Sequence, residues 1–169
     1  MGSWGVKVIQ SDYGLDLLII VEERYLRGVK FKTFHVKHIT ELLRAYIVDA
    51  FAKESYGWET QYLDFFYDYT LPYRYDEAII LIAECLTEFF TTGKLAINIF
   101  DKGKPRKKKI TEFVFTDDDL KSLLNDLQGV LTPERGLYES WKESASFDEW
   151  QAHIKMLCES VKNQIDKTA

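Results

Sequence analysis

The feature that most constrains the fold of this chain is a segment near its middle that has almost no polar face. Between about Tyr75 and Thr91, apolar residues occupy most positions; they are Ala78, Ile79, Ile80, Leu81, Ile82, Ala83, Leu86, Phe89 and Phe90. A helix that is apolar around most of its circumference must be covered by other elements. We therefore predict a central, buried helix that ends at Gly93, with the rest of the chain packed around it.

Five other segments have the spacing and the terminal residues of amphipathic helices. Apolar residues three and four positions apart predict a helix over about Val36 to Glu54. Capping residues mark the starts of the others, which we place at Ser11, Thr116, Thr132-Pro133 and Ser146. The first of these is expected to run to about Leu26 before Gly28, and the second to end at Gly129.

A stretch rich in β-branched and aromatic residues interrupts the helical pattern. Two such runs, at 95–100 and 110–115, flank a turn-forming segment at 101–105. This arrangement predicts a β-hairpin over about residues 94–115, with basic residues at the turn and on the start of the return strand. The predicted fold is therefore mainly α: a single domain over residues 1–169, with about six helices and one inserted hairpin.

Residues 56–75 hold nine aromatic side chains in twenty positions, with acidic residues between them and Pro72 as a break. We expect a short helix followed by an irregular stretch. Trp58, Phe65 and Phe66 are assigned to the core, whereas tyrosine hydroxyls tolerate a hydrated edge. Because Tyr and Trp dominate protein-binding hot spots, the segment also supplies a candidate partner-binding site. Its residues are Glu59, Tyr62, Asp64, Tyr67, Asp68 and Tyr69.

The charge of the chain is distributed unevenly. Residues 102–109 carry six positive charges, so with a net charge of −5 for the whole chain the remainder stands at −11. Basic side chains in such a cluster can contact phosphates, or they can protect a strand edge from pairing with another strand. The acidic remainder would repel nucleic acid, which makes nucleic acid the less favoured partner. The candidate residues are Lys104, Arg106, Lys107, Lys108 and Lys109.

The chain is expected to be cytoplasmic and to have no contact with a membrane. No apolar run approaches the roughly 20 residues that span a bilayer. The N-terminus has neither the basic start nor the apolar run of a secretion signal, and Val6 stands where a myristoylation motif needs Ser or Thr. Cys85 and Cys158 lie far apart in helical patterns and are interpreted as reduced core thiols.

The common catalytic motifs are missing from the sequence. It has no glycine-rich phosphate loop and no Gly-x-Ser-x-Gly motif, and neither cysteine lies in a thiol-protease signature. His35 and His38 share one helical face, but a catalytic zinc needs a third ligand, so surface histidines are the preferred interpretation. Acid pairs such as Asp76 and Glu77 are expected by chance among 27 acidic residues. We predict no cofactor, no metal and no catalytic residue.

The N-terminus carries a resemblance to a known family. Met1-Gly2-Ser3-Trp4-Gly5, followed by Ser11-Asp12-Tyr13-Gly14-Leu15, resembles a family of small bacterial proteins of unknown function. Those chains open with Met-Gly-Ala-Trp-Gly or a close variant, and an Asp-rich helix start follows. The likeness covers about the first 20 residues, with the helix start at Asp76-Glu77-Ala78 as a possible second point. Some members resemble immunity proteins that neutralise bacterial toxins, which implies a protein partner.

These observations lead to one preferred function and two alternatives. The preferred function is a non-catalytic cytoplasmic protein that binds another protein and is possibly an immunity protein that occludes a toxin. The first alternative is a nucleic-acid-associated protein that uses the basic hairpin. The second is an enzyme whose site is assembled from scattered His and carboxylate residues. The sequence does not set the oligomeric state.

Overall fold

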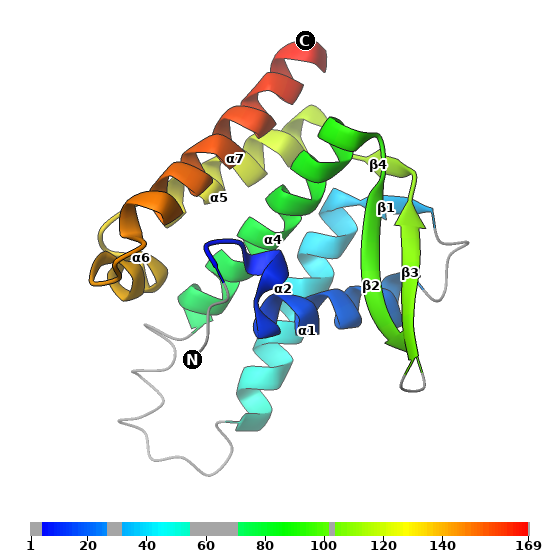
Figure 1. Cartoon of the computed structure of the whole chain (residues 1–169), viewed down its shortest axis with the longest axis horizontal. Coiled ribbons are helices and arrows are strands. Elements are labelled where there is room, and N and C mark those ends of the chain that lie inside the picture. The colour runs from blue at the N-terminus through cyan, green and yellow to red at the C-terminus, as the bar shows by residue number, and fades with distance from the viewer. Residues whose placement is uncertain (1–4, 27–31, 55–70, 102–103, 169) are drawn as a thin grey trace.

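The computed structural model describes residues 5–26, 32–54, 71–101 and 104–168, and within these ranges the protein is mainly helical (Figure 1). Its α-helices are α1 (Asp12–Val21), α2 (Val36–Glu54), α4 (Leu71–Thr92), α5 (Asp117–Val130), α6 (Gly136–Lys142) and α7 (Phe147–Thr168). A 3-10 turn, η1 (Val8–Gln10), precedes α1, and a π-helical turn, η2 (Glu22–Leu26), follows it. The predicted fold class, a set of about six helices with one inserted hairpin, is confirmed.

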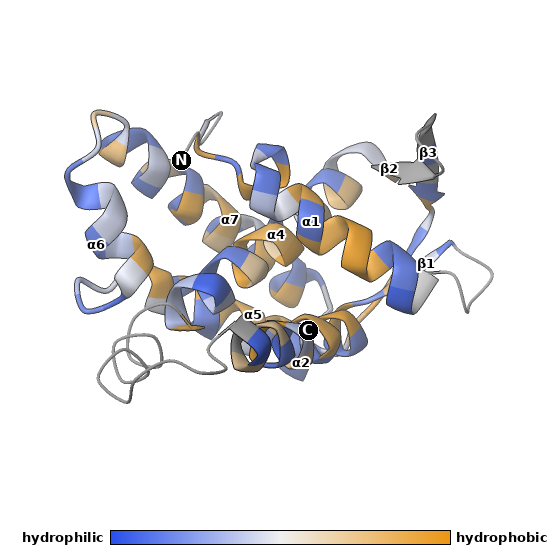
Figure 2. Cartoon of the chain, turned by 90° about the horizontal axis from the view of Figure 1, so that it is seen from below, coloured by the Kyte–Doolittle hydropathy of each residue, from blue (hydrophilic) through white to orange (hydrophobic). Residues whose placement is uncertain are grey.

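Helix α4 is the centre of the structure, as its sequence predicts. Helices α1, α2, α5, α6 and α7 all contact it, and hydrophobic residues gather on α1 and α4 in the middle of Figure 2. The helix begins at Leu71, not at Tyr75, so Pro72 lies in its first turn and does not break it. Proline is tolerated there because the first amides of a helix have no partner within the helix. The helix ends before Gly93, whose φ of 73° is a left-handed conformation that favours glycine.

The hairpin forms, but its return strand differs from the prediction. Strand β2 (Leu95–Asp101) pairs antiparallel with β3 (Lys104–Ile110), so the basic segment makes up the whole return strand. The run expected to return, residues 110–115, instead contributes β4 (Glu112–Val114), which pairs in parallel with β1 (Thr33–His35). The sequence analysis missed β1.

Aromatic packing explains why β4 leaves the hairpin. The ring of Phe113 stacks on Phe34 of β1, with centroids 4.6 Å apart, and lies 4.6 Å from the ring of Phe89 on α4. Phe34 is fully buried. Packing Phe113 between a strand and the central helix buries more apolar surface than an outer position on a two-stranded hairpin would.

Three of the four helix starts predicted from capping residues are confirmed and one is wrong. Helix α7 begins at Phe147, directly after Ser146. The Ser11 hydroxyl accepts a hydrogen bond from the Gly14 amide at the start of α1, and Thr116 forms a reciprocal capping box with Asp119 at the start of α5. By contrast, α6 begins at Gly136 and not at Pro133. The Thr132 hydroxyl instead donates to the Gly129 carbonyl at the end of α5, which leaves residues 132–135 in a turn.

Helix α1 is shorter than predicted and lies very close to the turn before it. It ends at Val21, where the chain continues as the π-helical turn η2. A Cβ at position 14 would overlap the carbonyl oxygen of Val8, so only glycine fits where η1 crosses the start of α1.

A buried carboxylate on α4 holds the N-terminal turn in place. Glu84 is 6% exposed, and it accepts hydrogen bonds from the Val8 amide at 3.0 Å and from the Ile9 amide at 2.7 Å. Its Oε1 also lies 2.7 Å from Nε2 of His153 on α7. Since an ionised carboxylate only accepts, His153 is the donor. One side chain thus joins η1, α4 and α7.

Replacing Glu84 with Gln should lower the free energy of unfolding by about 1–3 kcal/mol. An amide offers one acceptor oxygen and introduces two donors, so at least one of the three donors that Glu84 serves loses its partner. Urea denaturation followed by circular dichroism measures the effect. The matched control is Glu88→Gln, one turn further along α4 and exposed. Equal stability of the two variants would contradict the assigned role of Glu84.

Candidate functional site

The six residues proposed from the sequence as a partner-binding site all lie outside the described residues. Glu59, Tyr62, Asp64, Tyr67, Asp68 and Tyr69 belong to the segment 55–70 between α2 and α4. Trp4 of the N-terminal motif lies outside them as well, whereas Gly5 is described and has a φ of 144°. The partner-binding assignment of these six residues stays a prediction.

The basic candidates all belong to β3. Lys107 and Lys109 are exposed and lie opposite Asn98 and Ala96 in the register. Lys104, Arg106 and Lys108 also belong to the strand, together with Pro105 and Ile110. In the part of the chain that the structure describes, β2 and β3 form a sheet of two strands, so the outer edge of β3 carries these residues. Lysines on such an edge hinder pairing with strands of other molecules.

The histidines do not assemble into a metal site in the described ranges. The rings of His35 and His38 stack on each other with centroids 5.2 Å apart, while the third histidine, His153, is bonded to Glu84. No group of three or more possible metal ligands occurs among the described residues. Cys85 is buried and Cys158 half-buried, and both are free thiols, as predicted. Burial raises the pKa of both, which makes them poor nucleophiles.

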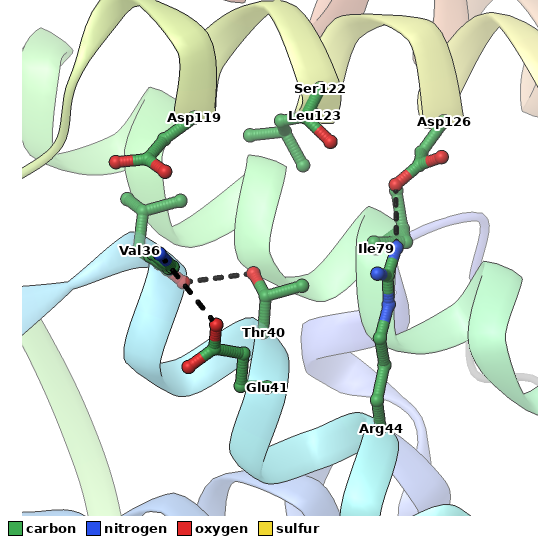
Figure 3. Close-up of a pocket in the computed structure, with 10 residues that line it drawn as sticks. Val36, Thr40, Glu41, Arg44, Ile79, Asp119, Ser122, Leu123 and Asp126 are labelled. Atoms are coloured by element: carbon green, nitrogen blue, oxygen red, sulfur yellow. Dashed lines mark hydrogen bonds and ion pairs between the residues drawn. The ribbon is translucent and has the colours of Figure 1, made fainter.

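The structure contains a groove that the sequence analysis did not predict. Side chains of α2 and α5, together with Ile79 of α4, line an open cavity of about 190 Å³ (Figure 3). In Figure 3 the side chains of α2 and α5 face each other across this space, with Ile79 of α4 at its base. The lining residues are Val36, Lys37, Thr40, Glu41, Arg44, Ile79, Asp119, Ser122, Leu123 and Asp126.

A second cavity of about 290 Å³ adjoins the first, since Arg44, Ile79 and Asp126 line both. Tyr75 and Asp76, near the start of α4, and Arg135, just before α6, complete its lining. We call the two cavities together the α2–α5 groove.

Ion pairs between separate elements organise the α2–α5 groove. Arg44 Nη2 of α2 lies 2.9 Å from Asp126 Oδ2 of α5, and Arg135 Nη1 lies 3.0 Å from Asp76 Oδ1 of α4. The two pairs differ in exposure, because the Asp76 side chain is only 2% exposed and that of Asp126 is 25% exposed. The second oxygen of Asp76, Oδ2, is buried and has no hydrogen-bond partner among the described residues. Buried carboxylate oxygens are seldom left in this state.

Burial changes the acidity of the groove. It raises the pKa of Asp76 to about 7; Arg135 lowers this pKa without offsetting the burial, and Asp126 raises it further. Burial likewise raises the pKa of the next residue, Glu77, to about 7, against the lowering effect of Arg74 at 3.5 Å. Arg74 in turn lies over the Tyr13 ring, 4.0 Å from its centroid. Asp76 lines the second cavity, and a carboxyl with such a pKa at a cavity marks a candidate functional site; Glu77 lines neither cavity.

The sequence contained one signal that could have found this site. Asp76, Glu77 and Glu84 are charged residues within the central helix, where burying a charge is costly unless the charge is paired. A pair of acids such as Asp76 and Glu77 is expected by chance from composition alone, and only the burial of its helix distinguishes it from the exposed acids.

The arrangement is suited to binding. The arginines of the α2–α5 groove are each engaged by a carboxylate, and the unmet hydrogen-bonding capacity belongs to a buried acceptor, Asp76 Oδ2. Such a site can take up a hydrogen-bond donor.

Comparisons with protein-family models, with curated proteins and with solved structures give no match. The resemblance of the N-terminal motif to a bacterial family therefore stays a prediction. Among the described residues, no helix is both long enough and apolar enough to cross a membrane.

The raised pKa of Asp76 predicts a distinct pH dependence of stability. Between about pH 4 and pH 7 the folded chain keeps a proton on Asp76 that the unfolded chain has released, so the free energy of unfolding falls as the pH rises. Asp76→Asn removes this contribution. We compare the free energy of unfolding of the variant with that of the original protein at each pH. This difference should shift in favour of the variant by roughly 2–4 kcal/mol from about pH 4.5 to about pH 8.

Urea denaturation at the two pH values measures this difference. The matched control is Asp118→Asn on α5, which removes the same charge from an exposed side chain. A difference no larger for Asp76→Asn than for Asp118→Asn would show that the pKa of Asp76 is not raised.

Proposed function

We propose that this protein acts in the cytoplasm by binding another protein, without catalysing a reaction, and that it is an immunity protein whose partner is a basic toxin. In this proposal the toxin is neutralised by occlusion of its active surface. The observation that carries the proposal is the α2–α5 groove, in which a buried carboxylate oxygen of Asp76 lacks a donor.

The charges of the groove and of the chain support a basic partner. Carboxylates of Glu41, Asp76, Asp119 and Asp126 line the groove against the cations of Lys37, Arg44 and Arg135. Outside residues 102–109, the chain as a whole carries an excess of eleven negative charges. An acidic surface speeds encounter with a basic protein and disfavours acidic competitors.

The proposal includes the aromatic and acidic segment that follows α2. This segment, with Glu59, Tyr62, Asp64, Tyr67, Asp68 and Tyr69, joins α2 to α4 in the sequence. Both of these helices line the α2–α5 groove. Aromatic side chains supply contact area in interfaces, and carboxylates supply selectivity for a basic partner.

A tagged full-length chain, recovered from its native cells at moderate salt, should retain a stoichiometric basic protein identified by mass spectrometry. Replacing the six segment residues with Ala should weaken this complex by about tenfold or more, since hot spots are concentrated in few side chains. The double variant Glu41→Gln/Asp126→Asn should weaken it as well. Calorimetry with the purified partner gives the affinities, and co-expression tests protection of cells.

The control is Asp16→Asn/Asp118→Asn, which removes two exposed carboxylates from α1 and α5 outside the groove. A chain that retains no protein partner would overturn the proposal. If the control and the groove variant weakened the complex equally, only the net charge would matter and the groove would not be the site.

A second candidate function rests on β3. Lys107 and Lys109 are exposed two positions apart on a strand, where alternate side chains share one face. Two such side chains can contact successive phosphates of a nucleic acid.

Replacing Lys107 and Lys109 with Gln tests this second function. Binding of a fluorescent single-stranded RNA should weaken in the variant, and the slope of log affinity against log salt should become shallower by up to about 1.4, about 0.7 for each lost phosphate contact. Unchanged binding and slope would exclude this role for β3.

A further inference from the structure

We propose that the cavity beside Asp76 is a recognition pocket for an arginine side chain of the protein partner. This inference rests on the proposed function and specifies which group of the partner enters the α2–α5 groove. It assigns to Asp76 the role of a binding residue, with Arg44, Asp126 and Arg135 as its surroundings.

The hydrogen bonds of Asp76 point to a missing donor. Its Oδ1 accepts from Arg135, while its Oδ2 is buried and has no partner in the described part of the chain. A guanidinium group carries five N–H donors in a planar fork that matches a carboxylate, and it is hydrated more weakly than an ammonium group. Arginine is therefore a better occupant than lysine for a site where the ligand must leave water.

The charges around the cavity also favour a cation. The α2–α5 groove holds four carboxylates and three cationic side chains. One added guanidinium group would therefore make the number of cationic groups equal to the number of carboxylates. The raised pKa of Asp76 has the same origin, because Arg135 alone does not offset the burial of the carboxyl. An additional cation would lower this pKa again.

Access to Asp76 requires small side-chain movements. Its Oδ2 is not exposed to solvent, but Arg135 is 34% exposed and Tyr75 is half-buried, and both line the cavity. Arg44, whose side chain is 50% exposed, pairs with Asp126, and both also line the cavity. These partly exposed residues can shift, whereas Ile79 at the base of the cavity is buried and stays fixed.

The pocket should respond to pH. The charged and titratable groups that face Asp76 are Arg44 of α2, Asp126 of α5 and Arg135, together with Tyr75 and Glu77 of α4 itself. At about pH 5.5 Asp76 is mostly protonated and cannot pair with a cation, and at about pH 8 it is mostly ionised. Affinity for a guanidinium should thus be about tenfold higher at the higher pH.

The direct test is an NMR titration of the full-length protein with the peptide acetyl-Gly-Arg-Gly-amide. Its counterpart with citrulline, which is neutral and nearly the same shape, serves as the ligand control. We expect the arginine peptide to shift resonances of the residues around the cavity, the citrulline peptide to bind at least about tenfold more weakly, and Asp76→Asn to weaken binding at least about tenfold. Asp118→Asn, with the same loss of charge at an exposed position, should leave the affinity within about twofold.

Absence of localised shifts, equal binding of the two peptides, or equal effects of Asp76→Asn and Asp118→Asn would overturn the proposal. The thermal transition of Asp76→Asn is measured first, and if that variant does not fold, Asp126→Asn takes its place with the same expectation and the same criteria. Equal binding at the two pH values would also contradict the role of Asp76.

The outcome for the pocket is separable from the outcome for the proposed function. If a protein partner is captured but its affinity is the same for the original chain and Asp76→Asn, the pocket is wrong while the binding function holds. If the arginine peptide binds as expected and no protein partner is captured, the pocket holds while the proposed function fails.

Discussion

The structure depends on one buried carboxylate, that of Glu84. It lies in the buried part of the central helix, where an unpaired charge would destabilise the fold, and three donors from two other parts of the chain offset this cost. The N-terminal turn is only three residues long, and these hydrogen bonds add to the packing of Val8 in the hydrophobic core. Once η1 is fixed, α1 can lie against it closely enough that position 14 must be glycine.

Helix α4 contains two kinds of buried acid, and the difference between them carries the functional argument. Both carboxylate oxygens of Glu84 have hydrogen-bond partners, which are the Val8 and Ile9 amides and His153, and the side chain is buried inside the protein. Asp76 has one ion pair and one oxygen without a donor, and it lines a cavity. The first arrangement is what a fold needs for stability. The second costs stability and is retained most readily where a ligand completes it.

Much of the fold was predictable because its signals are local. The spacing of apolar residues gave α2 with its observed bounds, and the absence of a polar face identified α4 as the central helix. The predictions that were wrong concern segments that can pair with more than one distant part of the chain. Phe113 belongs to a run that favours a strand, but only its contacts with Phe34 and Phe89 decide which strand it joins. The α2–α5 groove could not be predicted from local sequence patterns, because its lining comes from separate parts of the chain: Arg44, Asp76, Asp126 and Arg135.

The hydrogen bonds between Glu84 and the N-terminal turn η1 can form only after much of the chain has been synthesised. Val8 lies 76 residues before the carboxylate that holds it, and His153 enters the polypeptide 69 residues after that carboxylate. At about 5–20 residues per second, a ribosome needs roughly 4–15 s to add the residues between Val8 and Glu84. During that interval α1 can pack on α2, which is already synthesised, but the turn η1 lacks the carboxylate that accepts its amide hydrogen bonds. A chain truncated before residue 84 would therefore contain both helices and still leave η1 without this attachment.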